Sequence, residues 1–179
     1  GYSAAMPSRP PSRRRVLGLG VAASALLVAA WHGVGHLGSY PPLPFPARAV
    51  TPKTAAILAV LGNWLFPPGG PLPGSGGDLE TLRLIDEFLA DLPPHHAMLM
   101  QALPLAFEHG TALDRFGADR LTAMPPDQQR AYLDRWFQAN DLVHAQLLTG
   151  LKMLWNASYL ERLDVQQAMG TPYLCAVPA

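Results

Sequence analysis

The chain has 179 residues, of which 49% are hydrophobic and only 15% are charged, enough for one compact domain with a hydrophobic core but not for two. Without its first 30 residues it keeps 9 Lys and Arg against 13 Asp and Glu, a net charge of −4, and such a domain is a poor partner for nucleic acid. A single cysteine, Cys175, excludes an internal disulfide, and no C-x-x-C pair indicates a zinc, redox or c-type haem site.

The N-terminal residues are predicted to be an export signal. A twin arginine, Arg13 and Arg14, follows Ser12 and precedes an uncharged apolar run from Val16 to Trp31. A buried helix of that length would show a polar face, and this run shows none. A basic region followed by an apolar one is the order of a secretory signal, here of the twin-arginine type. Its recognition residues are Ser12, Arg13, Arg14, Val16 and Leu17.

The segment of residues 1–31 is either cleaved after export or retained as a membrane anchor. A cut after Ala30 fits the small residues at Val28 and Ala30. Retention as a single anchor is the alternative, because the run is only slightly shorter than the roughly 17–25 residues that span a bilayer. Both predict export by the twin-arginine route, either to the periplasm or to the periplasmic face of the inner membrane. Membrane contact would then be limited to residues 16–31, and only if they are not cleaved.

Residues 32–50 are predicted to be a linker, because their prolines and glycines favour extended or turning backbone. These are Gly33, Gly35, Gly38, Pro41, Pro42, Pro44 and Pro46. Helical spacing starts after them, with Thr51 as N-cap and Pro52 as the first residue of a helix that runs to about Phe66. The Gly- and Pro-rich stretch 67–77 is predicted to be a flexible loop.

Asp78 is predicted to cap a second helix, which closes before Pro93. Its apolar residues form one stripe, with Asp86 and the other charged residues mostly off it. The stripe consists of Leu79, Leu82, Ile85, Phe88, Leu89 and Leu92. A third helix should run from about Pro94 to His109, and Pro104 should kink or shorten it.

A short helical turn is expected from Thr111 to Phe116, followed by an amphipathic helix that opens at Pro125 and Pro126. This amphipathic helix bears Tyr132, Leu133, Trp136 and Phe137. Asn140 should cap the longest helix, which is the candidate for the central core helix. Its apolar side is formed by Leu147, Leu148, Leu151, Leu154 and Trp155.

A last short helix is expected between a cap at Asp164 and a stop at Gly170. No alternating apolar and polar run is long enough for a strand. The predicted fold class is therefore all-α: a compact bundle of about six helices over residues 51–179, which follows the signal or anchor segment and the linker.

Histidines are the first candidates for chemistry. His95 and His96 are adjacent and would point about 100° apart on a helix, and no His-x-x-x-His or Glu-x-x-His pair lies in the helical domain. The glycines of residues 67–77 follow no strand, so no phosphate cradle is predicted, and no Gly-x-Ser-x-Gly is present. We therefore predict no catalytic, metal-binding or cofactor-binding site in this chain. One rival is an enzyme that pairs His95, His96 or His144 with a carboxylate.

Two further groups suggest contacts with another chain. Cys175 lies in a tail with Tyr173 and Leu174, where it is either a small apolar contact or, in an oxidising compartment, a disulfide to a partner. The tryptophans fall mostly on helix faces, which favours core packing, with one or two at a subunit interface as the sharper alternative. They are Trp31, Trp64, Trp136 and Trp155.

Short packing motifs from Thr51 onward resemble a known family. They are Thr51-Pro52 through Ala55-Ala56 to Leu65-Phe66-Pro67-Pro68-Gly69; Phe88 to Pro94; Leu121 to Met124 with Gln129 to Leu133 and Trp136; and Leu148-x-x-Leu151-Lys152-x-Leu154 leading to Tyr159. Their order over about residues 51–173 resembles the small subunit (subunit 3, gamma-type) family of membrane-bound gluconate 2-dehydrogenase.

The resemblance implies an accessory role. The small subunit would hold no flavin itself. It would bind a flavoprotein of the glucose–methanol–choline type, which carries the FAD, lacks an export signal and leaves the cell together with it. A cytochrome c or another electron-transfer subunit is a further partner that this reading allows.

The sequence thus predicts a non-catalytic, chaperone-like small subunit of an FAD-dependent dehydrogenase that acts on a sugar, polyol, alcohol or sterol. The alternative is a stand-alone, membrane-tethered helical binding or scaffold protein of the periplasm. The predicted partner interface combines the long helix with the tail, because both offer apolar surface. Its residues are Leu147, Leu151, Leu154, Trp155, Tyr159, Tyr173, Leu174 and Cys175.

Overall fold

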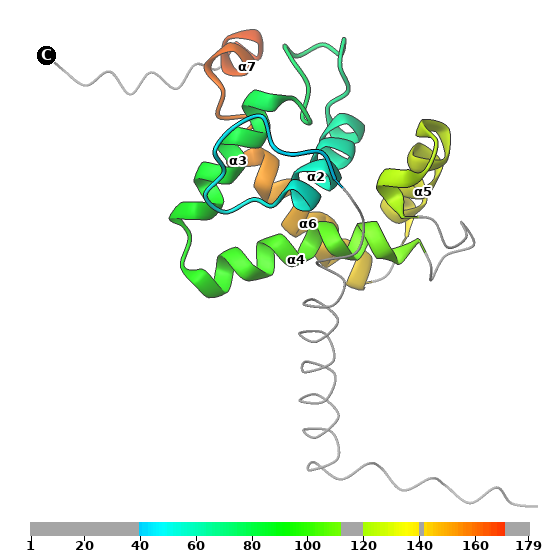
Figure 1. The fold of residues 1–179 in the computed structure, drawn as a ribbon. Helices are drawn as coiled ribbons and strands as arrows, with labels where there is room; N and C mark the ends of the chain where they lie inside the picture. Colours follow the sequence, from blue (N-terminus) through cyan, green and yellow to red (C-terminus); the bar gives the residue numbers. More distant parts are fainter. Residues whose placement is uncertain (1–39, 112–119, 140–141, 171–179) are drawn as a thin grey trace, which may run out of the picture. The chain divides into compact units, whose positions relative to one another are not determined.

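The fold is seen in a computed structural model that describes residues 40–111, 120–139 and 142–170. In these ranges the chain forms six α-helices and one 3-10 helix and contains no strand, which confirms the predicted all-α class (Figure 1). The predicted signal and its cleavage point, nearly all of the helical turn expected after Thr111, the cap at Asn140, and Tyr173, Leu174 and Cys175 lie outside the described residues.

The first two helices begin where the sequence places their caps. α2 (Pro52–Leu65) follows Thr51, whose hydroxyl oxygen accepts a hydrogen bond from a first-turn amide at 3.1 Å. α3 (Leu79–Asp91) follows Asp78, whose carboxylate accepts from a first-turn amide at 2.9 Å. Each cap satisfies an amide that has no partner within its own helix.

α4 (Pro94–Gly110) has 17 residues and is the longest helix in the described part of the chain. Pro104 lies inside it and does not shorten it. A proline removes one helical hydrogen bond, but Pro104 is buried and α4 packs against both α2 and α6, so tertiary contacts offset the loss. α6 (Leu142–Asn156) has 15 residues in the described part of the chain, so there α4 is longer than α6, the helix that the sequence predicts to be the longest.

The remaining elements are η1 (Leu121–Ala123), α5 (Pro126–Gln138) and α7 (Leu163–Ala168). α5 begins at the predicted proline pair, whereas η1 was not foreseen. The N-cap of α7 is Arg162, so the predicted cap at Asp164 is displaced by two residues. Asp164 lies instead in the first turn, where a negative charge favours the positive end of the helix dipole. Gly170 follows α7 with φ of 69°, the left-handed conformation that glycine adopts after a helix.

α6 lies in the middle of the bundle, as predicted, and contacts α3, α4 and α5 (Figure 1). Its buried apolar residues are Leu148, Leu151, Leu154 and Trp155. They share one hydrophobic core with residues of α2, α3 and α5, among them Ile57, Leu58, Leu61, Ile85, Leu89, Tyr132 and Leu133. The helices are therefore held together mainly by burial of their apolar faces.

Residues 40–50, which the sequence assigns to the linker, pack against the helices, and we call them the strap. Asp86 of α3 fixes one end of the strap. Its carboxylate accepts hydrogen bonds from the amides of Arg48, Ala49 and Val50 at 2.9, 2.8 and 2.7 Å. Asp86 is buried, although the helical pattern puts it off the apolar stripe. Three amide donors compensate for the removal of its charge from water.

Candidate interaction surface

Most of the described residues predicted to meet a partner are buried inside this chain. Leu151, Leu154 and Trp155 are fully covered and Tyr159 is almost so. Leu147 is partly buried against the same core. This apolar side of α6 is thus covered by the chain's own helices and loop, so Leu151, Leu154 and Trp155 are not open to a partner.

Trp155 and Tyr159 hold the glycine-rich loop that was expected to be flexible. The Trp155 indole N–H donates to the Gly76 carbonyl at 2.7 Å, and the Tyr159 hydroxyl donates to the Pro73 carbonyl at 3.1 Å. At Gly62 of α2 a Cβ atom would overlap the Gly76 carbonyl, so the loop and the helix touch backbone to backbone. The glycines therefore permit close packing here, and the loop is anchored at several points.

An ion cluster around Arg162 closes the same loop. The Arg162 guanidinium is buried and lies 2.6 Å from Asp78, 3.0 Å from Glu80 and 2.8 Å from Asp164. The bond from Arg162 holds the pKa of Asp164 below its usual range. Burial acts to raise the pKa of Asp78, but two amide donors and Arg162 outweigh it and the net shift is downward. The cluster joins the start of α7 to the start of α3.

A cleft with a volume of about 310 Å³ lies between α2 and α5. Its lining combines apolar and polar side chains. The lining residues are Val60, Asn63, Trp64, Pro67, Pro126, Asp127, Gln129, Arg130 and Leu133. The volume falls at the lower end of the roughly 300–1,000 Å³ usual for binding clefts. The cleft is therefore a candidate seat for a single side chain or a small group.

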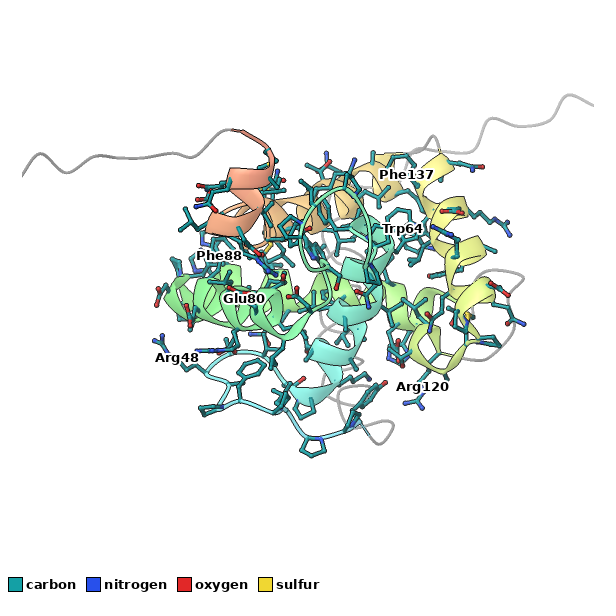
Figure 2. The ribbon with its side chains drawn as sticks, turned by 90° about the horizontal axis from the view of Figure 1, so that it is seen from above. Arg48, Trp64, Glu80, Phe88, Arg120 and Phe137 are labelled. Carbon is teal, nitrogen blue, oxygen red and sulfur yellow. The ribbon has the colours of Figure 1, made fainter. Side chains whose placement is uncertain are left out.

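Trp64, which lines this cleft, forms an aromatic pair with Phe137, and Figure 2 shows the two side chains close together. Their rings meet edge to face with centroids 5.8 Å apart. The Trp64 indole N–H donates to Asp134 at 2.8 Å, which fixes the ring. Phe137 is 53% exposed, and the Lys152 ammonium lies 5.0 Å from its ring centre. We call the cleft together with Trp64 and Phe137 the α2–α5 surface.

The exposed position of Phe137 could have been predicted from the sequence, because two large aromatic residues follow each other there. Trp136 and Phe137 are neighbours and point about 100° apart on a helix, so one helix face cannot bury both. Trp136 is the buried one, and it packs on Phe107 with ring centroids 4.6 Å apart. Other large apolar side chains are also exposed, on α3, α4, α6 and α7 and directly after α7: Leu79, Met98, Leu99, Met153, Leu163 and Met169.

A polar cluster fastens the other end of the strap. Glu108 of α4 is fully buried and accepts hydrogen bonds from the Tyr40 hydroxyl at 2.7 Å and from the Thr122 hydroxyl at 2.6 Å. Arg120 donates to the Tyr40 oxygen at 3.0 Å. The acidic and basic side chains of this cluster connect the strap, α4 and η1, so they have a structural role.

The histidines do not assemble a metal site within the described residues, which contain no group of three His, Cys, Asp or Glu side chains able to hold an ion. The His95 and His96 rings, expected to diverge, lie with centroids 3.9 Å apart. His144 packs edge to face on Trp136 at 4.4 Å. His109 belongs to the polar cluster and contacts Lys53.

No helix within residues 40–111, 120–139 and 142–170 is long and apolar enough to cross a membrane. Comparison with known proteins gives no match to a family model, to a curated protein or to a solved structure. What the protein does must therefore be inferred from its own residues and geometry.

Proposed function

We propose that this chain is a non-catalytic small subunit that binds, stabilises and co-exports an FAD-dependent dehydrogenase of the glucose–methanol–choline type. The substrate of that partner would be a sugar, polyol, alcohol or sterol. The twin-arginine pattern at Arg13 and Arg14 supports co-export, because this route carries proteins that are already folded. The motif resemblance to the gluconate 2-dehydrogenase small subunit supports the choice of partner.

The observation that carries the binding role is the α2–α5 surface. It combines a cleft with an aromatic pair, of which Trp64 is fixed by Asp134 and Phe137 is left open to solvent. Aromatic anchors beside a cleft dominate the binding energy of many protein interfaces. Arg130 also lines the cleft, and arginine, like tryptophan, is enriched among the residues that dominate binding at protein interfaces.

The use of the buried charged groups also supports a binding role. Asp86 and Glu108 fix the two ends of the strap, and Arg162 joins α3 to α7. Each of these groups holds two segments of the chain together. A subunit that serves to stabilise another protein needs such a rigid scaffold, because a preformed surface loses less entropy on binding.

The proposal is tested by purifying the tagged full chain from its own host. We expect it to bring down one polypeptide with a Gly-x-Gly-x-x-Gly motif and no signal peptide, in stoichiometric amount, together with a flavin absorption band. The small subunit purified alone should show no flavin band. Recovery of the chain alone at every step would contradict the accessory role and favour the stand-alone binding protein.

The surface is tested with Phe137→Asp, which adds a charge at the exposed ring. We expect the yield of co-purified flavoprotein to fall at least about tenfold, the effect of 1.4 kcal/mol or more. Met98→Asp on α4 is the matched control, because Met98 is 50% exposed and lies on another helix. If both variants keep full yield, the partner binds elsewhere. If only Met98→Asp loses yield, α4 is the contact.

A further inference from the structure

Lys53 and His109 form an unusual contact between two helices. Lys53 lies in the first turn of α2 and is only 5% exposed, and its Nζ is 3.1 Å from Nε2 of His109 in the last turn of α4. A charged ammonium group can only donate, so Nε2 must offer its lone pair. The contact therefore requires a neutral His109 with its proton on Nδ1.

The same groups surround the first residue of the strap. The Lys53 ammonium lies 5.9 Å from the centre of the Tyr40 ring, and the Arg120 guanidinium lies 5.3 Å from it. The Tyr40 hydroxyl donates to Glu108, the residue next to His109. The charged groups that act on His109 are thus Lys53 from α2, Glu108 from α4 itself and Arg120 from the segment before η1.

We propose that His109 is a proton-operated latch for the strap. A proton on Nε2 removes the acceptor of the Lys53 hydrogen bond and places a second positive charge about 3 Å from the first. Lys53 then moves away from His109 and its contact with the Tyr40 ring weakens. The second anchor of the strap, on Asp86, does not depend on this proton, so acid weakens the Lys53 contact with the ring at the Tyr40 end and leaves the Asp86 end bound.

The electrostatics of the site give the sign of the effect. Burial lowers the pKa of His109 from its ordinary value of 6.5, and the charge of Lys53 lowers it further, against an opposite effect of Glu108. The folded protein therefore binds this proton less readily than the unfolded chain. The contribution of neutral His109 to the stability of the fold is complete above pH 6.5 and is lost as the pH falls below that value.

Lys53 and Asp86 titrate in other pH ranges than His109. The pKa of Lys53 is lowered from 10.5, mainly by burial, so its own contribution changes in the alkaline range. Burial acts to raise the pKa of Asp86, but amide donors bring it below its ordinary 3.8. Below pH 6.5, protonation of His109 therefore acts at the Tyr40 end of the strap while the carboxylate of Asp86 still holds the other end.

The latch is tested by nuclear magnetic resonance titration of the full chain with labelled histidine and tyrosine rings. We expect His109 to titrate below 6.5 and the Tyr40 ring signals to move with the same midpoint. In His109→Gln, which cannot gain this proton, the Tyr40 signals should stay constant from pH 7.5 to 4.5. The matched control is His95→Gln, at an exposed position of α4, and it should leave the Tyr40 titration as in the original chain.

A second variant guards against a folding defect in the first. Lys53→Met removes the neighbouring charge, so the His109 midpoint should rise relative to the original chain. The proposal is overturned if Tyr40 does not respond to the His109 titration, if Tyr40 still titrates in His109→Gln with normal circular dichroism, or if the His109 midpoint is unchanged in Lys53→Met.

Discussion

At the scale of single residues, two buried carboxylates, Asp86 and Glu108, hold the strap in place, as the hydrogen bonds of a helix or sheet would hold a regular element. The strap has no helix or strand in which to satisfy its amides, and Asp86 accepts three of them at once. Glu108 likewise accepts hydrogen bonds from the Tyr40 hydroxyl and from the Thr122 amide. A buried charge is tolerated only when donors surround it, so each carboxylate fixes the position of the segments that supply those donors.

We predict that Asp86→Asn destabilises the fold by about 1–3 kcal/mol at pH 7, because a neutral amide oxygen replaces a charged acceptor of three bonds. The pKa of Asp86 is lowered on folding, so its contribution is present above pH 3.8 and is lost as the pH falls through the folded value. Urea unfolding from pH 7 to pH 3 measures this, and the gap between variant and original should narrow with acid. Glu87→Gln, at the exposed neighbouring position, should change stability by less than about 0.5 kcal/mol. Equal effects of the two variants would contradict the role given to Asp86.

At the scale of elements, N-caps determine where helices begin, and close contacts between backbones determine how α2 packs on the glycine-rich loop. Thr51 and Asp78 start α2 and α3 through local hydrogen bonds, and local signals of this kind are visible in a sequence. The contact between α2 and the glycine loop is different, because it joins Gly62 to Gly76 and Gly77, far along the chain. There the lack of a side chain lets two backbones touch.

We predict that Gly62→Ala destabilises the protein by about 2 kcal/mol or more, although alanine favours a helix, because its Cβ would overlap the Gly76 backbone. Gly150→Ala is the matched control inside α6. The atoms nearest to its Cβ belong to the flexible Leu103 side chain, with Cδ1 at 2.7 Å, and this side chain can move aside. Thermal melting should therefore show a clear loss for the first variant and a small change for the second. A Gly62→Ala variant as stable as the original would show that the loop is free to move away.

At the scale of the whole molecule, the chain combines a predicted export segment with a packed helical unit, which the structure describes over residues 40–111, 120–139 and 142–170. The strap fixes the start of that unit at two points, Tyr40 and Asp86. A protein that crosses a membrane in the folded state must be packed before export. The burial of Trp155 and Tyr159 beneath the glycine loop fits a domain that completes its own core.

Replacement of Arg13 and Arg14 by Lys should leave the protein, and any bound flavoprotein, in the cytoplasm. Lysine keeps the positive charge but lacks the planar donor pattern of arginine, so a receptor that reads the twin arginine should reject it. Cell fractionation measures the outcome, with Arg9→Lys as the matched control that keeps the pair. Normal export of the double variant would contradict the twin-arginine prediction.

The sequence by itself determined the helical class, the start of each of the first two helices and the central place of α6. These features depend on residues a few positions apart: Thr51 before Pro52, Asp78 before Leu79, and the repeat of Leu148, Leu151 and Trp155. Caps and helical periodicity act within one or two turns, so a linear pattern records them.

Only the tertiary structure decided which apolar residues stay exposed and which polar residues are buried. Leu151, Leu154 and Trp155 looked available to a partner, yet they are covered by segments distant in the sequence, while Phe137 remains open. Asp86 looked like a surface residue, and the strap that buries it begins 46 positions earlier, at Tyr40. The physical reason is that burial depends on what packs on each face, and this is set by contacts between segments that no local pattern connects.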